Sequence, residues 1–587
     1  MKNESDKSMH SESLTAKHDK RTETPFDVIP SGTPDRCVPG QMIRDEMVPM
    51  RDGVKLATDV YLPEGEGLFP VILTRMPYGK REPYCYMPLI GEFWTKKGYA
   101  FVVQDVRGKW GSEGVFEPNS KKNESSDGYD TIEWIVKQTW SNRRVGMWGE
   151  SYYGFTTYAG AVSQHPHLVC IAPGDIALDR YQCTFRNGAL QLNTVGMWAI
   201  YMMAREYQDT RNIDPWHLPL AEMANAAGIP SDYFDQIIAN PVPGKFWEEH
   251  GLLEGYEKIR IPVLHWSGWY DSYLGQVIRD WFELGRRNLS AGHNHLFIGP
   301  WDHEATADKL HRVGCIKVDE ETAEHHWDTY QAFFDHYLMG LSNGFDSPPP
   351  VHLFVLGDNV WRDEQEWPLA RTRFTKFYLH SNGMADTLND DGILSKTTPG
   401  AEQADTYVYD PMNPVADTLD IDCYSIAGQM GNRSEIEGRR DVLVYSTEEL
   451  DSDMEITGPI KANLFAASSA VDTDFTVTLV DVFEGGYANL IQDGIIRASY
   501  RDSDLEPSPI APGKVYEYTI DLWATSYVVK KGHRLRIEVF SSCFNRYDRN
   551  TNTGEPFGKA TGTVPAKQTV FHSREYPSHI TLPIIPR

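Results

Sequence analysis

A serine lies between two glycines in the segment GESYYG, residues 149–154. A serine hydroxyl is a weak nucleophile unless a base removes its proton, and the oxyanion that it creates needs hydrogen-bond donors. A sharp turn from a strand into a helix exposes the hydroxyl and points the next backbone N–H to the place where the oxyanion forms. Such a turn is crowded, and glycines relieve the crowding. The segment therefore predicts Ser151 as a nucleophile. A capping serine stays open as an alternative, because the usual Gly-x-Ser-x-Gly pattern has its second glycine one residue earlier.

A candidate acid and a candidate base follow the serine along the chain. The segment VLHWSGWYD ends at Asp271, and LFIGPWDH ends at His303. Each lies where a predicted strand stops, and the order Ser, Asp, His is that of an α/β-hydrolase. Taken singly, Asp271 is explained as a helix cap and His303 as a loop histidine. The occurrence of all three residues in this order favours a catalytic triad. Asp302 is not assigned as the acid, because the side chains of adjacent residues such as Asp302 and His303 usually point apart.

These residues need a parallel sheet covered by helices to bring them together. Short β-rich runs alternate with helical runs up to about residue 175, which is typical of such a sheet. The predicted strands begin near Ala57, Phe69, Tyr99 and Arg143, and a helix begins near Gly128. We therefore predict the first part of an α/β-hydrolase domain at 41–175.

The pattern changes twice after this part. Residues 176–258 are helical in period without a convincing strand, which indicates an inserted helical cap. Strands return near Ile261 and His293, so the second part of the hydrolase domain is predicted at 259–367. From 368 to 587 short alternating segments are separated by turn residues, which is typical of an antiparallel β-sandwich. The polar residues 1–40 are predicted to be a disordered tail.

The composition of the chain restricts the classes of binding partner that we expect. The net charge of −27 repels phosphate backbones and anionic lipids, so a nucleic acid is not expected as a partner. The seven cysteines are scattered, with no Cys-x-x-Cys pair, so neither a disulfide framework nor a zinc site is indicated. No window approaches 18 apolar residues, and the N-terminal segment has no apolar core of a secretory signal. We expect a cytoplasmic protein without membrane contact, and homo-oligomer formation stays open.

Several segments together resemble a known family. MVPMRDGVKLATDVYLP, RMPYGK, VVQDVRGKWGSEGVFEP, GESYYG, SGWYDSY, GPWDH and FNRYDRNTNTG are similar, in order, to segments of the cocaine esterase and X-Pro dipeptidyl-peptidase-like (S15-type) serine hydrolases. The resemblance runs from about Met47 to the end of the chain. The serine turn of this family is Gly-x-Ser-Tyr-x-Gly, which accounts for the position of Gly154. It also implies that the C-terminal sandwich is a jelly roll.

The resemblance implies roles for further residues. Ser151, Asp271 and His303 would be the triad, and the Tyr78 hydroxyl with the Tyr152 backbone N–H would bind the oxyanion. A buried, structural Tyr78 stays open as the alternative. The reaction would need no metal or organic cofactor. Aromatic and thioether residues of the cap would contact substrate or pack the cap itself, and we name Tyr181, Phe185, Trp198, Met202 and Trp216.

We predict an esterase or amide acylase that acts on small to medium acyl compounds. X-Pro dipeptidyl peptidases of this family carry a long additional N-terminal helical domain, for which about 40 polar residues leave no room. The α-amino-acid ester hydrolases have acidic residues directly after the triad aspartate, whereas Asp271 precedes Ser272, Tyr273 and Leu274. Both activities remain alternatives. A catalytically silent carbohydrate-binding or ligand-binding protein is the alternative of a different class.

Overall fold

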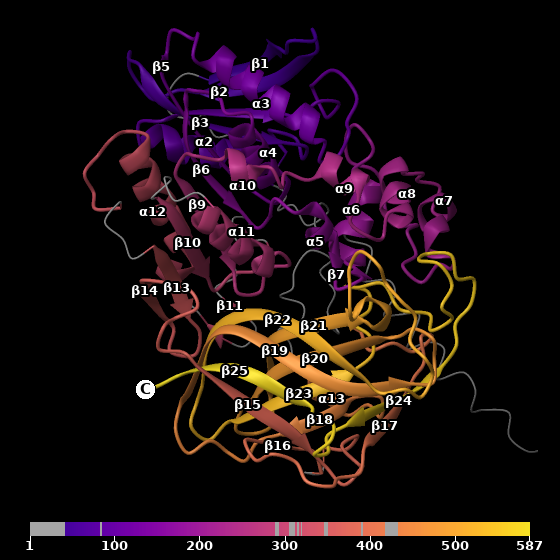
Figure 1. Cartoon of the computed structure of the whole chain (residues 1–587). Helices are drawn as coiled ribbons and strands as arrows, with labels where there is room; N and C mark the ends of the chain where they lie inside the picture. Colours follow the sequence, from indigo (N-terminus) through magenta and orange to yellow (C-terminus); the bar gives the residue numbers. More distant parts are fainter. Residues whose placement is uncertain are drawn as a thin grey trace, which may run out of the picture.

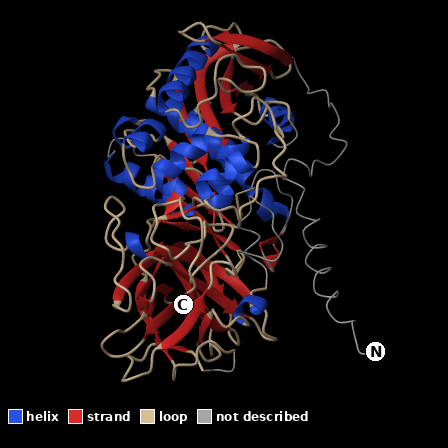
Figure 2. Ribbon diagram, turned by 90° about the vertical axis from the view of Figure 1, so that its right-hand side faces the viewer, coloured by secondary structure: helices blue, strands red, loops and turns tan. Residues whose placement is uncertain are grey.

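The computed structural model describes two parts that contact one another (Figure 1). The described residues are 42–82, 85–287, 293–303, 312–313, 316–317, 320–345, 350–388, 391–416 and 432–587. The predicted tail at 1–40 lies outside them. The first part is a sheet with helices on its faces, and the second consists of strands and loops with few helical turns (Figure 2).

Ten strands form the first sheet, in the order β1-β2-β4-β3-β5-β6-β9-β10-β13-β14. Their bounds are β1 (Met42–Pro49), β2 (Lys55–Tyr61), β3 (Phe69–Met76), β4 (Ala100–Asp105), β5 (Ser141–Glu150), β6 (Leu168–Gly174), β9 (Val263–Gly268), β10 (Asn294–Gly299), β13 (Val351–Val355) and β14 (Val360–Glu364). From β4 to β13 all neighbours are parallel, and the outer strands β1, β2 and β14 are antiparallel. The central strands are apolar runs because both faces of a parallel sheet are buried. The sequence patterns predicted the other inner strands but missed β6 as well as β1 and β14.

Helices cover both faces of this sheet. They are α2 (Met87–Lys96), α3 (Lys121–Ile135), α4 (Ser151–Val162), α11 (Leu274–Arg287) and α12 (Glu320–Tyr337). Successive residues of β5 point to opposite faces. A Cβ on Gly146 would meet Phe334 of α12, whereas Met147 approaches Gly160 of α4. Helices α4 and α12 therefore lie on opposite sides of the strand that carries the serine.

The segment between β6 and β9 consists mainly of short helices. They are α5 (Arg180–Thr184), the π-helix η2 (Leu192–Met197), α6 (Trp198–Tyr201), η3 (Leu220–Glu222), α7 (Met223–Ala226), α8 (Asp232–Ala239), α9 (Lys245–His250) and α10 (Gly255–Lys258). A small hairpin of β7 (Phe185–Arg186) and β8 (Ala189–Leu190) interrupts them. The expectation that no strand intervenes is therefore wrong for four residues. Their pairing is decided by contact with the C-terminal domain, where Arg186 bonds Asp493 at 3.0 Å.

The C-terminal part is the expected all-β jelly-roll domain. Its strands are β15 (Arg373–His380), β16 (Ile393–Ser395), β17 (Asp405–Tyr409), β18 (Leu443–Ser446), β19 (Met454–Ser468), β20 (Asp474–Val482), β21 (Ala488–Arg497), β22 (Tyr516–Val529), β23 (Arg534–Phe540), β24 (Ala566–Phe571) and β25 (His579–Ile585). Two short helical turns, α13 (Ser434–Glu437) and η5 (Ala498–Tyr500), accompany them. The strands enclose an apolar core that continues to Trp269 and Leu274 of the first part. The two parts therefore share one packed boundary.

We propose to keep the domain division at 41–175, 176–258, 259–367 and 368–587. The change from sheet to short helices after β6, and the return to the same sheet at β9, support it. The two-residue strands β11 (Arg312–Val313) and β12 (Ile316–Lys317) pair with each other only. Among the helices of the described residues, none combines the length and the apolar composition needed to cross a bilayer.

Candidate active site

Ser151 lies on a tight turn between β5 and α4. Its φ of +50° is in the left-handed region, which positions a side chain above the end of the sheet. A Cβ on Gly149 would lie 2.4 Å from the Tyr153 carbonyl oxygen, and one on Gly154 would lie 2.8 Å from the Gly174 oxygen. No side chain fits at such distances. The two glycines are therefore required by the close packing of the turn, as the sequence predicted.

The loops after β9 and β10 are held together by backbone contacts. The Tyr270 N–H donates to the Trp301 carbonyl at 3.1 Å. A Cβ on Gly268 would lie 1.9 Å from that same Trp301 oxygen, so β9 must end on a glycine. These two loops carry Asp271 and His303. Their pairing places both side chains at the carboxyl ends of neighbouring parallel strands.

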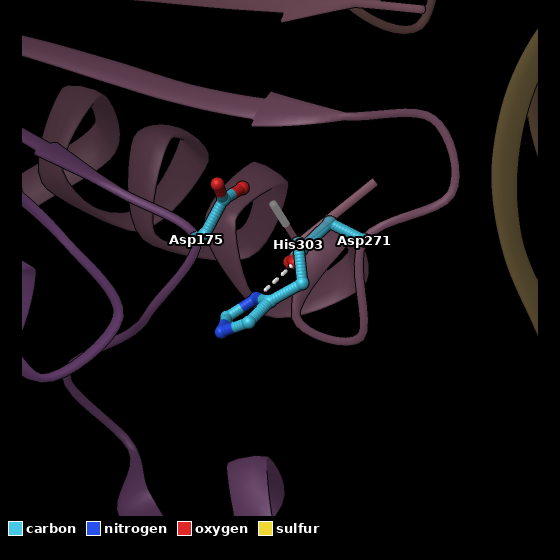
Figure 3. Close-up of side chains that lie close together, drawn as sticks. All are labelled: Asp175, Asp271 and His303. Carbon is cyan, nitrogen blue, oxygen red and sulfur yellow. Dashed lines mark hydrogen bonds and ion pairs between the residues drawn. The ribbon is translucent and has the colours of Figure 1, made fainter. Parts of the chain in front are cut away.

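The structure brings Ser151, Asp271 and His303 together. The His303 Nε2 lies 3.0 Å from the Ser151 Oγ, and the His303 Nδ1 lies 2.6 Å from the Asp271 Oδ2 (Figure 3 shows the second contact). The other Asp271 oxygen accepts a hydrogen bond from the Tyr273 backbone N–H at 2.6 Å. Both carboxylate oxygens of Asp271 are thus engaged, and the imidazole bridges the carboxylate and the hydroxyl.

A second buried carboxyl group, that of Asp175, lies beside this pair (Figure 3). It follows β6 at a φ of +49°, and one of its oxygens lies within 4.8 Å of ligand atoms of Asp271 and His303. Neither Asp175 oxygen makes a hydrogen bond with another residue that the structure describes. Burial, followed by the neighbouring charges of Asp271 and Glu150, raises the pKa of Asp175 well above its usual range. The environment of Asp175 therefore favours the protonated form of its carboxyl group more than water does.

The cluster of Asp175, Asp271 and His303 has donor atoms close enough to be compared with a metal site. Metal bonds of about 2.0–2.2 Å to nitrogen and oxygen leave those two atoms roughly 3 Å apart or more. The His303 Nδ1 and Asp271 Oδ2 are 2.6 Å apart, and the remaining imidazole nitrogen contacts Ser151. The geometry therefore fits a hydrogen-bonded pair better than a metal site.

Tyr78 and Tyr152 lie on either side of the serine. The Trp198 Nε1–H donates to the Tyr78 hydroxyl at 3.1 Å, so the Tyr78 oxygen is the acceptor in this bond. Burial raises the pKa of Tyr78, and hydrogen bonds with Trp198 and Ser151 oppose that rise. The Tyr152 hydroxyl donates to Glu124 at 2.8 Å. This bond fixes the first turn of α4 and with it the backbone N–H next to Ser151.

The pocket above Ser151 is built from the hydrolase domain and the helical segment. Its lining consists of Tyr78, Cys85, Asn119, Glu150, Ser151, Tyr152, Tyr153, Ile176, Arg180, Thr194, Val195, Trp198, Tyr273 and His303. Of the five cap residues proposed from the sequence, only Trp198 lies in this lining. Tyr181 and Phe185 stack on each other with centroids 5.5 Å apart, Met202 is buried, and Trp216 packs on Phe544. These four side chains serve packing.

Sequence reasoning missed three charged or ionisable residues near the serine. Asp175 follows the end of β6, and the rule that selected Asp271 and His303 at strand ends also applies to it. Glu150 directly precedes Ser151 and accepts a hydrogen bond from the Tyr153 hydroxyl. Arg180 begins the short helix α5. No local pattern marks Arg180, because its position in the pocket depends on how the helical segment packs.

The fold and the site define the class of protein. A parallel sheet with a serine at a strand-to-helix turn, followed by an aspartate and a histidine after later strands, is the arrangement of α/β-hydrolases. Residues 52–305 match the model of the X-Pro dipeptidyl-peptidase (S15) family. Residues 343–581 match the X-Pro dipeptidyl-peptidase C-terminal non-catalytic domain.

Individual proteins are similar over nearly the whole chain. A cocaine esterase of Rhodococcus sp. (strain MB1 Bresler) is 37% identical, over 92% of this chain and 98% of its own length. The crystal structure of an aminopeptidase from a marine sediment Thaumarchaeota archaeon is 28% identical with a TM-score of 0.84, covering 95% of this chain and 99% of that one. An α-amino acid ester hydrolase structure is 28% identical with a TM-score of 0.81, covering 96% and 100%.

The chain belongs to the cocaine esterase and X-Pro dipeptidyl-peptidase-like (S15) family of α/β-hydrolases. It is therefore a serine hydrolase of this esterase and peptidase family.

Proposed function

We propose that the protein hydrolyses ester or amide bonds of small to medium acyl compounds through an acyl-enzyme on Ser151. The observation that carries this proposal is the hydrogen-bonded chain from the Ser151 Oγ through His303 to Asp271, with contacts of 3.0 and 2.6 Å. The cocaine esterase and the α-amino acid ester hydrolase, both similar over nearly the full chain, support ester bonds as targets.

The proton transfers follow from the contacts of His303. With its Nδ1 proton held by Asp271, His303 accepts the Ser151 proton on Nε2 as the hydroxyl oxygen attacks the substrate carbonyl carbon. The imidazolium then donates that proton to the leaving alcohol or amine, and the acyl group stays on Ser151. A water molecule, deprotonated by the same Nε2, attacks the acyl-enzyme and releases the acid. The Asp271 carboxylate orients and stabilises the imidazolium in both steps.

The negative charge on the attacked carbonyl oxygen needs donors. The Tyr78 hydroxyl and the Tyr152 backbone N–H are proposed to supply them. Support comes from the Trp198 Nε1–H, which occupies an acceptor site of the Tyr78 oxygen and leaves its proton directed to another partner. Burial raises the pKa of Tyr78, so the group donates a proton in a hydrogen bond without losing it.

Replacing Tyr78 tests this assignment. Tyr78→Phe should lower kcat by about 10²- to 10³-fold, because one preorganised donor is lost at the oxyanion while the ring is kept. KM should change less, since the donor acts mainly on the transition state. Steady-state kinetics with 4-nitrophenyl acetate measures both values. Tyr207→Phe is a control, because the Tyr207 hydroxyl donates to the backbone oxygen of Tyr78 at 2.9 Å and Tyr207 is not among the residues that line the pocket. A Tyr78→Phe rate near that of the control would contradict the role.

Substrate charge separates the proposed esterase from its alternatives in the family. Neither Ser272 nor Tyr273, which follow Asp271, offers a carboxylate for a substrate ammonium. Arg180 adds a positive charge to the pocket. Methyl esters of free phenylalanine should therefore have no advantage over those of N-acetylphenylalanine. Measured kcat/KM values for the two esters, and for Gly-Pro-4-nitroanilide, check this prediction.

The results distinguish the activities. Turnover of 4-nitrophenyl esters with equal or lower rates for the free amine supports the esterase. A strong preference for the free amine would indicate that Glu150 acts as an ammonium site, since its carboxylate lines the pocket. Efficient cleavage of Gly-Pro-4-nitroanilide would instead establish a dipeptidyl peptidase.

A further inference from the structure

Arg180 is a buried arginine of the active-site pocket that forms no ion pair with the residues that the structure describes. Its exposed fraction is 4%, and it lines the same pocket as Ser151 and His303. Its Nε and Nη1 atoms make no hydrogen bond. Among the residues that the structure describes, no carboxylate lies within the 4.0 Å of an ion pair with its guanidinium.

Other buried arginines in the described parts of the chain have partners. Five of them pair with carboxylates, namely Arg75 with Glu124, Arg186 and Arg546 with Asp493, Arg433 with Glu538, and Arg497 with Asp474. Arg549 donates to two backbone carbonyls. Arg180 differs from all of these. A guanidinium does not lose its proton in proteins, and a buried charge without a partner is costly. The site therefore favours an anion that comes from outside the chain.

The surroundings of Arg180 place such an anion next to the reacting groups. Tyr273 lines the same pocket as Arg180, and its ring centroid lies 5.3 Å from that of His303. Burial raises the pKa of Tyr273, and the charge of Arg180 opposes that rise, as it also does at Tyr233. The electrostatic effect of Arg180 thus reaches the wall of the pocket beside His303. Arg180 and Ser151 line the same pocket, so a ligand bound to Arg180 would lie in the pocket that holds the Ser151 Oγ.

We propose that Arg180 binds a carboxylate of the substrate, so that the preferred substrates are esters or amides that carry a negative charge near the scissile bond. This inference rests on the proposed function, because it assigns the substrate class of the same pocket. A carboxylate matches the planar, forked donors of a guanidinium, and the bonds between them are charge-assisted. The negative charge is carried by either the acyl part or the leaving group, and the experiment distinguishes these two sources.

Matched substrates measure the preference. For the leaving group, 4-acetoxybenzoate is compared with its neutral methyl ester, and for the acyl part, monoethyl adipate is compared with diethyl adipate. At pH 7.5, kcat/KM should be about 10- to 100-fold higher for the anionic member of one pair, as expected for hydrogen bonds to a charged group. The pair that shows this ratio identifies the part of the substrate that contacts Arg180.

Variants of Arg180 test whether this residue causes the preference for anionic substrates. In Arg180→Met the ratio of kcat/KM values should fall to about 1, and Arg180→Lys should retain an intermediate ratio because it keeps the charge but loses the fork. The ratio does not depend on the fraction of folded enzyme. Arg279→Met is the matched control. Arg279 bonds Asp179 at 3.3 Å, next to α5, but its side chain is 47% exposed and outside the pocket lining. The ratio should stay at the wild-type value in this control.

A measurement on the wild-type enzyme keeps the inference testable if the variants do not fold. Benzoate should inhibit hydrolysis of 4-nitrophenyl acetate at least 10-fold more strongly than benzamide, which has the same shape without the charge. Equal inhibition, together with no preference in either substrate pair, would overturn the inference while the esterase activity stands. Inhibition by chloride but not by benzoate would indicate a small inorganic anion and would also overturn it.

The measurements would give a different result if the protein did not hydrolyse esters. If neither substrate pair nor 4-nitrophenyl acetate is hydrolysed, the esterase proposal fails. Binding of benzoate, measured by calorimetry, then tests whether Arg180 binds an anion. Binding that is present in the wild type and lost in Arg180→Met supports an anion site, and its absence in the wild type rejects it.

Discussion

Ser151→Ala should lower kcat for ester hydrolysis by about 10⁶-fold, which is the loss seen when the nucleophile of such a triad is removed. The variant has no atom that can form the acyl-enzyme, whereas the imidazole and the oxyanion donors stay in place. Alanine accepts the φ of +50° no worse than serine, so the turn should keep its conformation. Labelling by a fluorophosphonate probe should be abolished.

A serine at the other end of the same helix provides the control. Ser163 caps α4 and donates to the Gly160 carbonyl at 2.6 Å, far from the pocket lining. Ser163→Ala should be labelled by the probe like the wild type. Persistent labelling of Ser151→Ala, or turnover within 100-fold of the wild type, would show that another residue is the nucleophile. Thermal unfolding of both variants checks that they are folded.

Asp271→Asn should lower kcat by about 10⁴-fold. The reason lies in the contacts of its two oxygens. The Tyr273 N–H donates to Oδ1 at 2.6 Å, so the oxygen of an asparagine amide would take that position. The amide NH₂ would then face the His303 Nδ1, which is 2.6 Å from Oδ2 in the present structure. His303 would have to carry its proton on Nε2, where it could no longer accept the Ser151 proton.

Asp302→Asn is the control for this substitution. Asp302 is adjacent to His303 in the sequence, whereas the carboxylate oxygen at 2.6 Å from the His303 Nδ1 belongs to Asp271. Steady-state kinetics should show less than a tenfold change for Asp302→Asn. A larger loss for Asp302→Asn than for Asp271→Asn would reverse the assignment of the acid. Titration of the histidine by NMR should also show the changed tautomer in Asp271→Asn.

The sequence predicted the elements that carry the site because their signals are local. The turn at Ser151 requires two glycines, and the runs before Asp271 and His303 have the apolar composition of buried parallel strands. The order of the three residues then indicated the fold class. The edge strands β1 and β14 were missed, because their exposed and mixed residues lack the apolar pattern of central strands.

Contacts between distant segments could not be predicted in this way. The Gln492 side chain of β21 donates to the Trp269 carbonyl at 2.9 Å, and the Tyr270 hydroxyl donates to the Leu490 carbonyl at 3.3 Å. The C-terminal domain thus supports the loop that carries Asp271. Nothing in the pattern around Gln492 indicates this contact, because it depends on the packing of two domains.

The sequence by itself determined the strand-to-helix turn at Ser151, the sheet that places Asp271 and His303 at one edge, and the change from a helix-covered sheet to an all-β domain. Each is encoded by side-chain periodicity and turn residues over a few positions. Only the tertiary structure decided that Asp175 lies buried beside Asp271 and His303, with a raised pKa. It also decided that Trp198 and Arg180 line the pocket. Burial and electrostatic environment depend on which distant segments pack together, and that information is absent from any local stretch of the chain.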